Sequence, residues 1–125
     1  MNKFYIEETK YTPEISMDPD NGVISMTGKS YPENTFEFYR PVMDWLEEYF
    51  EKNTKEKTVV NMEIIYFNSS SSKLFFDFFD LLEESTEDKN IEINWIYDEE
   101  NESALEAGED FQEDFEELNI KLVMK

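Results

Sequence analysis

The stretch KTVVNMEIIYFNSSSSKLFFDFFDLLEE, residues 57–84, decides the fold. Its first eleven residues alternate in character, so that every second residue from Val60 to Tyr66 lies on a fully apolar face while the opposite face is mixed. This pattern indicates a β-strand with one face buried and the other only partly covered. Asn68 and four serines then interrupt the run, and the phenylalanines and leucines that follow recur at helical spacing. The stretch therefore predicts a strand that passes through a short polar junction into a helix.

The flanking sequence adds elements on both sides of this unit. Apolar periodicity and turn residues predict strands over 4–7, 14–17, 23–27, 90–97 and 119–124, and helices over 36–50 and 100–117. Either Glu33 or Asn34 is suited to open the first of these helices, after the Tyr31-Pro32 break. Pro41 lies inside the same helix and predicts a kink or a later start, because proline lacks a backbone N–H.

The order of these elements is β-β-β-α-β-α-β-α-β. It contains two β-α-β units, whose crossovers are expected to be right-handed and whose strands are expected to be parallel. We predict an α/β fold with a single layer of mixed sheet, helices mainly on one face, and an antiparallel N-terminal edge. The length of 125 residues fits one domain over residues 1–125.

Composition restricts the chemistry of the chain. Aromatic residues make up 16% of it, which excludes a disordered acidic tail because disordered segments are poor in aromatics. Cysteine and histidine are both absent, so the chain lacks Ser-His-Asp and Cys-His nucleophiles and the usual ligands of zinc and transition metals. Residues 98–117 hold 11 acidic side chains, but they do not follow the spacing of a calcium loop and indicate a solvated helix face. We expect neither a metal nor a cofactor.

The charge of the chain restricts its partners. Net charge is −20, and residues 61–125 carry 19 acidic and 4 basic side chains. A field of this sign repels phosphate backbones and anionic lipids, so we expect no nucleic-acid partner and no membrane partner. A protein with a basic patch would be attracted instead. The first residues hold no long apolar run and no stretch is long enough to span a bilayer, so we expect a cytoplasmic protein.

The serine run 69–72 lies where ligands gather in parallel α/β sheets, between the end of a strand and the start of a helix. Asn and Ser are common helix caps, and capping alone would explain one or two of these residues. A phosphoacceptor is the alternative, because a phosphoryl group here would face the positive end of the helix dipole with Lys73 one turn away. On these residues alone capping is the simpler explanation, and both stay open.

Several strings in the sequence resemble a known family. The apolar strand, serine turn and helix are similar to the STAS pattern of anti-sigma-factor antagonists, although Asn68 replaces the usual Asp and Ser71 stands where glycine is usual. The resemblance is closer to the SiaC-type regulatory phosphoproteins, which are STAS-like, and it covers residues 12–115. It rests on five strings, SYPEN (30–34), DWL (44–46), YFNSSS (66–71), DLLEE (80–84) and WIYDEENE (95–102).

This resemblance implies a partner-switching module. Ser69 takes the place of the phosphorylated residue, with Ser70 as second choice. The resemblance also implies a cognate serine/threonine kinase and a PP2C-type phosphatase. The unmodified form would bind an effector, either a diguanylate cyclase that controls cyclic-di-GMP and biofilm formation or an anti-sigma factor. The residues expected to contact partners are Tyr31, Pro32, Glu33, Asn34, Asn68, Ser70, Ser71 and Lys73.

Two other functions remain as alternatives. A constitutive protein-binding scaffold would use the same fold, with the serines acting only as helix caps. A small hydrolase would use paired carboxylates, such as Asp77 with Asp80 or Glu83 with Glu84, and would need a deep polar pocket at the serine junction. Neighbouring carboxylates are unavoidable in so acidic a chain, so we do not expect an enzyme.

Overall fold

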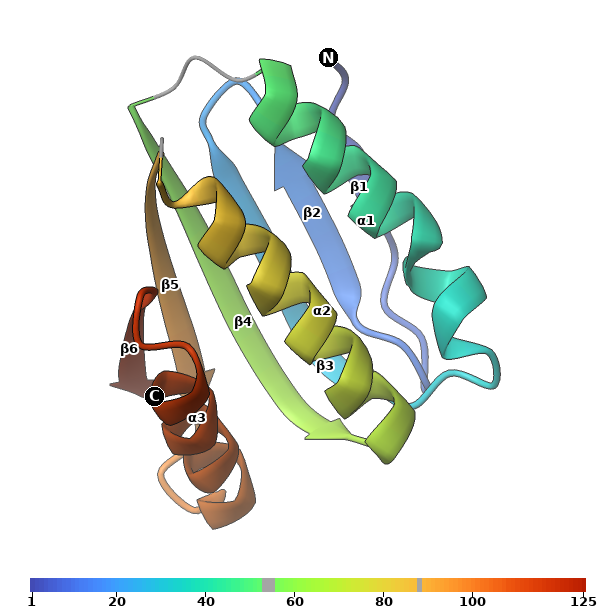
Figure 1. The fold of residues 1–125 in the computed structure, drawn as a ribbon. Coiled ribbons are helices and arrows are strands. Elements are labelled where there is room, and N and C mark those ends of the chain that lie inside the picture. Colours follow the sequence, from blue (N-terminus) through green and yellow to red (C-terminus); the bar gives the residue numbers. More distant parts are fainter. Residues whose placement is uncertain (53–55, 88) are drawn as a thin grey trace.

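The described parts of the chain hold nine helices and strands, in the order that the sequence predicts. The computed structural model describes residues 1–52, 56–87 and 89–125. The elements are β1 (Phe4–Ile6), β2 (Glu14–Asp18), β3 (Val23–Ser30), α1 (Thr35–Lys52), β4 (Lys57–Phe67), α2 (Ser69–Ser85), β5 (Asn90–Tyr97), α3 (Glu102–Asp114) and β6 (Asn119–Met124) (Figure 1). The predicted α/β class and element order are confirmed.

The six strands form one mixed sheet in the order β1-β2-β3-β4-β5-β6. β1 and β2, and β2 and β3, are antiparallel, whereas the pairs β3–β4, β4–β5 and β5–β6 are parallel. The parallel part therefore holds three β-α-β units, one more than predicted, because β3 also pairs with β4. Each unit adds its new strand on the same side of the previous one, so crossovers of one hand leave all their helices on the same face.

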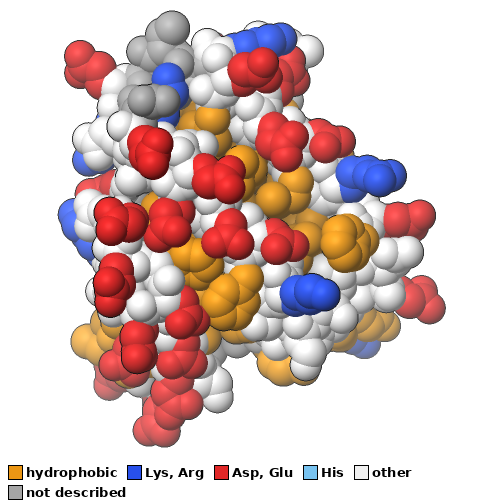
Figure 2. All heavy atoms as spheres, viewed as in Figure 1, with side chains coloured by type: hydrophobic (Ala, Val, Ile, Leu, Met, Phe, Trp, Pro, Cys, Tyr) orange, Lys and Arg blue, Asp and Glu red, His pale blue; other side chains and the backbone are white. Residues whose placement is uncertain are grey.

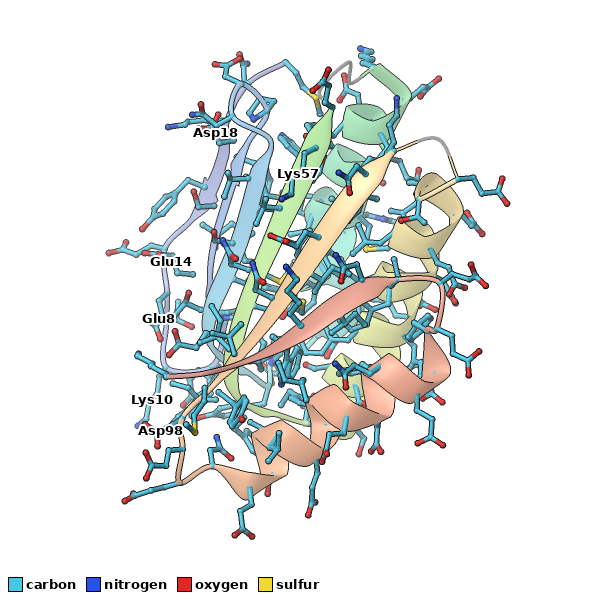
Figure 3. The ribbon with its side chains drawn as sticks, turned by 90° about the vertical axis from the view of Figure 1, so that its left-hand side faces the viewer. Glu8, Lys10, Glu14, Asp18, Lys57 and Asp98 are labelled. Carbon is cyan, nitrogen blue, oxygen red and sulfur yellow. The ribbon has the colours of Figure 1, made fainter. Side chains whose placement is uncertain are left out.

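The helices cover one face of the sheet and leave the other open. Figure 1 shows α1, α2 and α3 in front of the strands, and Figure 3 shows Glu14 and Asp18 pointing away from the helices. On the open face polar side chains form ion pairs. Glu92 Oε1 lies 2.8 Å from Lys121 Nζ and 3.6 Å from Lys57 Nζ. The predicted one-sided helix layer is confirmed.

The core lies between the sheet and this helix layer. β4 contributes Val60, Met62 and Ile64, none more than 1% exposed, against fully buried phenylalanines of α2. Tyr66, predicted for the same apolar face, is 54% exposed instead. Gly28 of β3 pairs with Ile64 of β4, but the next residue, Lys29, pairs with Tyr66, so the register shifts at this point. The alternation of buried and exposed residues in β4 therefore ends after Ile64, before the strand itself ends at Phe67.

The ends of α1 and α3 correct two predictions. α1 starts at Thr35, after Asn34, whose Oδ1 accepts a hydrogen bond from the Glu37 N–H at 3.2 Å, and it continues through Pro41. The later start at Pro41 is wrong, because Pro41 is exposed and water can satisfy the carbonyl that its missing N–H leaves unpaired. α3 is shorter than predicted, since the residue before it, Asn101, is its cap.

Close contact between α3 and β5 depends on a glycine. Gly108 is buried, and a Cβ atom there would lie 2.6 Å from Leu122 Cδ2 and 2.6 Å from Trp95 Cδ1. Trp95 is fully buried, and its Nε1 donates a 2.8 Å hydrogen bond to the carbonyl of Ala104, so the ring is held in place. α3 therefore reaches the sheet only with a residue that lacks a side chain at this position.

We predict that Gly108→Ala lowers the free energy of unfolding by about 1–3 kcal/mol, because α3 must move away from Trp95. The change would run against helix propensity, which favours alanine. Urea unfolding followed by tryptophan fluorescence measures it, with Glu109→Ala on the exposed face of α3 as control. An unchanged unfolding midpoint for Gly108→Ala would contradict the contact.

Candidate regulatory site at the carboxyl ends of the strands

Asn68 is the residue that caps α2. Its backbone is extended, its Oδ1 accepts a 2.9 Å hydrogen bond from the Ser71 N–H, and its carbonyl accepts the first helical bond, from the Ser72 N–H at 2.9 Å. One asparagine therefore performs the capping that the serines were suited to perform. Capping leaves the hydroxyls of the serine run without an explanation.

The four serines occupy different environments. Ser69 and Ser70 are exposed in the first turn of α2, and Ser72 is half-buried. The backbone N–H groups of a first helical turn have no partner within the helix and point toward solvent or a ligand, so an anion at Ser69 or Ser70 would meet positive potential. Lys73 is exposed one turn further along the helix.

Ser71 is fully buried and cannot contact a partner, which corrects the expectation for that residue. Its Oγ lies 2.8 Å from Ser30 Oγ, which lies 2.6 Å from the hydroxyl of Tyr39. Helical geometry turns the third residue of α2 toward the sheet while the first two face solvent. Burial raises the pKa of Tyr39 to about 12, so its hydroxyl stays protonated at neutral pH.

A groove lies between the start of α2 and the segment before α1, and of the four serines only Ser70 lines it. Its volume is about 440 Å³, and it lies where the N-terminal ends of α1 and α2 meet. Six residues that the sequence predicted as partner contacts line it: Pro32, Glu33, Asn34, Asn68, Ser70 and Lys73. The Asn68 N–H also donates a 3.1 Å hydrogen bond to the carbonyl of Ser30, which connects the two segments through the backbone. Of the four carboxylates considered for a hydrolase, Asp77 alone lines this groove.

Tyr31, the remaining predicted contact, belongs to a cluster of tyrosines beside the groove. Its ring lies edge-on to Tyr11 at 5.3 Å and to Tyr66 at 5.6 Å between centroids. Tyr11 and Tyr66 are 53% and 54% exposed. A second hollow of about 730 Å³ is lined by Tyr11, Tyr31 and Phe38 together with Pro32 and Glu33, which also line the groove. The two hollows therefore form one continuous surface.

Sequence reasoning missed Tyr11 and Tyr66. Tyr11 follows β1, and Tyr66 near the end of β4 was predicted to be buried. Both residues come close to Tyr31 only because β2 lies beside β3 and β4 pairs with β3. The available signal was the position of Tyr66 next to the polar junction, where a strand leaves the core.

Charge separates the two faces of the molecule. Figure 2 shows acidic side chains spread over the helix layer with few basic ones among them, and α3 carries none that is basic. Several lysines lie on the open face of the sheet instead, where Lys57, Lys121 and Lys125 contact glutamates of β4 and β5. A partner that approaches the helix layer therefore meets a field that favours basic groups.

Within residues 1–52, 56–87 and 89–125, no group of three or more acidic side chains is arranged to hold a metal ion. Within the same ranges, none of the helices combines the length and the apolar character needed to cross a bilayer.

Known proteins resemble the chain over nearly its whole length. The model of the family described as SiaC family regulatory phosphoprotein matches residues 6–125. An uncharacterized protein of Pseudomonas aeruginosa (strain UCBPP-PA14) is 36% identical over 115 residues, which cover 91% of this chain and 90% of that protein.

Solved structures of P. aeruginosa SiaC share the fold. The apo form is 30% identical, with a TM-score of 0.88, and the match covers 98% of this chain and 99% of the other. SiaC in complex with the diguanylate cyclase SiaD, whose activator it is, is 33% identical, with a TM-score of 0.91 over the same shares. This chain belongs to the SiaC family of regulatory phosphoproteins.

Proposed function

We propose that this chain is a phosphorylation-switched regulator, a single domain over residues 1–125, whose unmodified form binds and activates a diguanylate cyclase and so acts on cyclic-di-GMP and biofilm formation. The observation that carries the proposal is the exposure of Ser69 and Ser70 in the first turn of α2, beside the groove formed with residues 32–34. The complex of P. aeruginosa SiaC with SiaD supports the choice of effector.

Ser69 is the proposed phosphoacceptor, and Ser70 is the second choice. A kinase needs a hydroxyl that it can reach, and among the four serines only these two are exposed. A phosphoryl group at this position would lie at the positive end of the α2 dipole, near Lys73, so the folded state would tolerate the modification.

The phosphoryl group would act by changing the charge beside the groove, which is lined by Asn68 and Ser70, the two neighbours of Ser69 in the chain. It adds about two negative charges at neutral pH to a surface that Glu33 and Asp77 already line. An effector that fits the unmodified groove would then meet both added bulk and added negative charge. We therefore assign release of the effector to the modified form, addition of the phosphoryl group to a cognate serine/threonine kinase, and its removal to a PP2C-type phosphatase. The chain would act in the cytoplasm, where such a kinase finds ATP.

The effector surface proposed here extends from the groove to the tyrosine cluster. Tyr11, Tyr31 and Tyr66 offer large amphipathic rings, a residue type enriched at protein interfaces. Phe36 in the groove is 72% exposed and adds an apolar contact next to Ser70. The chain supplies binding rather than catalysis in this proposal. The likeness to STAS domains stays a prediction.

We predict that the cognate kinase with ATP adds one phosphate to the wild-type chain and that Ser69→Ala abolishes this modification. Ser70→Ala tests the second choice, and Ser72→Ala, at the half-buried serine, is the matched control. Intact-mass measurement and fragmentation of the phosphopeptide locate the group. Undiminished phosphorylation in both Ser69→Ala and Ser70→Ala would rule out the assignment.

A charge at position 69 is expected to weaken effector binding. Ser69→Glu should raise the Kd for the diguanylate cyclase about tenfold or more, which corresponds to roughly 1.4 kcal/mol, whereas Ser69→Ala should bind like the wild type. Calorimetric titration and cyclase activity measure the two effects, and Ser85→Glu at the other end of α2 is the control. Equal affinity in all variants would favour the constitutive scaffold.

Stability separates the capping residue from the switch residue. Asn68→Ala should lower the free energy of unfolding by about 1 kcal/mol, because the Ser71 N–H loses its acceptor. Ser69→Ala should change it by less than about 0.5 kcal/mol, since an exposed first-turn serine does not cap α2. Urea unfolding of both variants checks this, and a larger loss for Ser69→Ala would show that its hydroxyl has a structural role.

A further inference from the structure

Three hydroxyl groups form a buried chain inside the apolar core. Ser30 Oγ lies 2.6 Å from Tyr39 Oη and 2.8 Å from Ser71 Oγ, and none of the three residues is more than 1% exposed. They come from β3, α1 and α2, three elements that otherwise pack through apolar side chains. We call Ser30, Tyr39 and Ser71 the hydroxyl network.

Packing alone does not require these hydroxyls. Burying a polar group is unfavourable unless it is hydrogen-bonded, and apolar residues of similar shape at all three positions would leave no group unpaired. The apolar contacts around Tyr39, such as the edge-to-face contact with Phe75 at 6.0 Å, constrain the position of a helix less strictly than hydrogen bonds do. A satisfied polar network instead restricts the core to one arrangement.

The hydroxyl network connects the two walls of the groove. Ser30 directly precedes Tyr31 and the groove residues 32–34, and its carbonyl accepts the Asn68 N–H at 3.1 Å. Ser71 directly follows Ser70, and its own N–H is bound to Asn68 Oδ1 at 2.9 Å. A displacement of the first turn of α2 therefore reaches Ser30 through both a backbone bond and a side-chain bond.

We propose that the hydroxyl network is a positioning device that couples the serine run to residues 31–34. It holds the first turn of α2 in register with the segment before α1, so the groove has its binding shape before a partner arrives. Any displacement of this turn, including one that accompanies the binding of a partner or the addition of a phosphoryl group, would be transmitted to residues 31–34 through Ser71 and Ser30. The inference rests on the proposed function where it concerns effector binding, and on the structure alone where it concerns the coupling.

Ser71→Ala and Tyr39→Phe each remove one bond of the network and leave the other in place. Tyr49→Phe is the matched control, because the Tyr49 hydroxyl is also buried and lies 2.9 Å from Thr58 Oγ1, near the opposite end of α1. Hydrogen exchange needs no partner, and two amides report on the two walls. The Tyr31 N–H is bonded to the Tyr11 carbonyl at 2.8 Å and the Asn68 N–H to the Ser30 carbonyl.

We expect Ser71→Ala and Tyr39→Phe to accelerate exchange at both amides several-fold, and Tyr49→Phe to leave both unchanged at matched global stability. Coupling predicts that Ser71→Ala affects Tyr31, forty residues earlier in the chain. Unchanged exchange at Tyr31 in both network variants would overturn the inference. Equal acceleration by Tyr49→Phe would do the same, because the hydroxyls would then contribute stability only.

Effector affinity provides the second measurement. The diguanylate cyclase of the same organism should bind Ser71→Ala and Tyr39→Phe several-fold more weakly than the wild type, and Tyr49→Phe as well as the wild type. Failure of the wild-type chain to bind the cyclase would contradict the proposed function, while the exchange result would still decide the coupling. Full affinity in both network variants would limit the network to a structural role.

Discussion

The direction in which the chain adds strands is the constraint on which the rest of this structure depends. From β3 to β6 each parallel strand is placed on the same side of the one before it, with a helix in each crossover. Crossovers of one hand then place α1, α2 and α3 on a single face (Figure 1). The N-terminal ends of the helices consequently lie at the same edge of the sheet as the carboxyl ends of β3, β4 and β5, and the groove forms where the first two helices begin.

The same constraint separates the charges of the molecule. One face of the sheet packs against the helices and the other meets solvent. Strands that alternate apolar and polar residues satisfy both environments. The helices expose outer faces that are rich in acidic side chains, as Figure 2 shows, whereas Lys57, Lys121 and Lys125 are paired with glutamates on the open sheet face. A phosphoryl group beside the helix layer would add negative charge to a surface that is already negative.

Adjacent serines at the start of α2 differ in their exposure to solvent. Ser69 and Ser70 face solvent, while Ser71 is fully buried and bonded to Ser30. A helix rotates about 100° per residue, so three consecutive side chains cannot share one environment when a sheet lies on one side. The proposed switch uses the exposed pair, and the proposed coupling uses the buried member next to it.

The sequence by itself determined the class of the fold, the order of its elements and the place of the junction, because periodicity and turn chemistry are local. It also identified the family through short strings such as YFNSSS. The late start at Pro41, the burial of Tyr66 and the partner role of Ser71 were wrong, since each depends on which side of an element meets solvent. The tyrosine cluster and the hydroxyl network were decided only by tertiary structure. Tyr11, Tyr31 and Tyr66, like Ser30 and Ser71, are far apart in the chain, and strand pairing and helix packing alone bring them within contact.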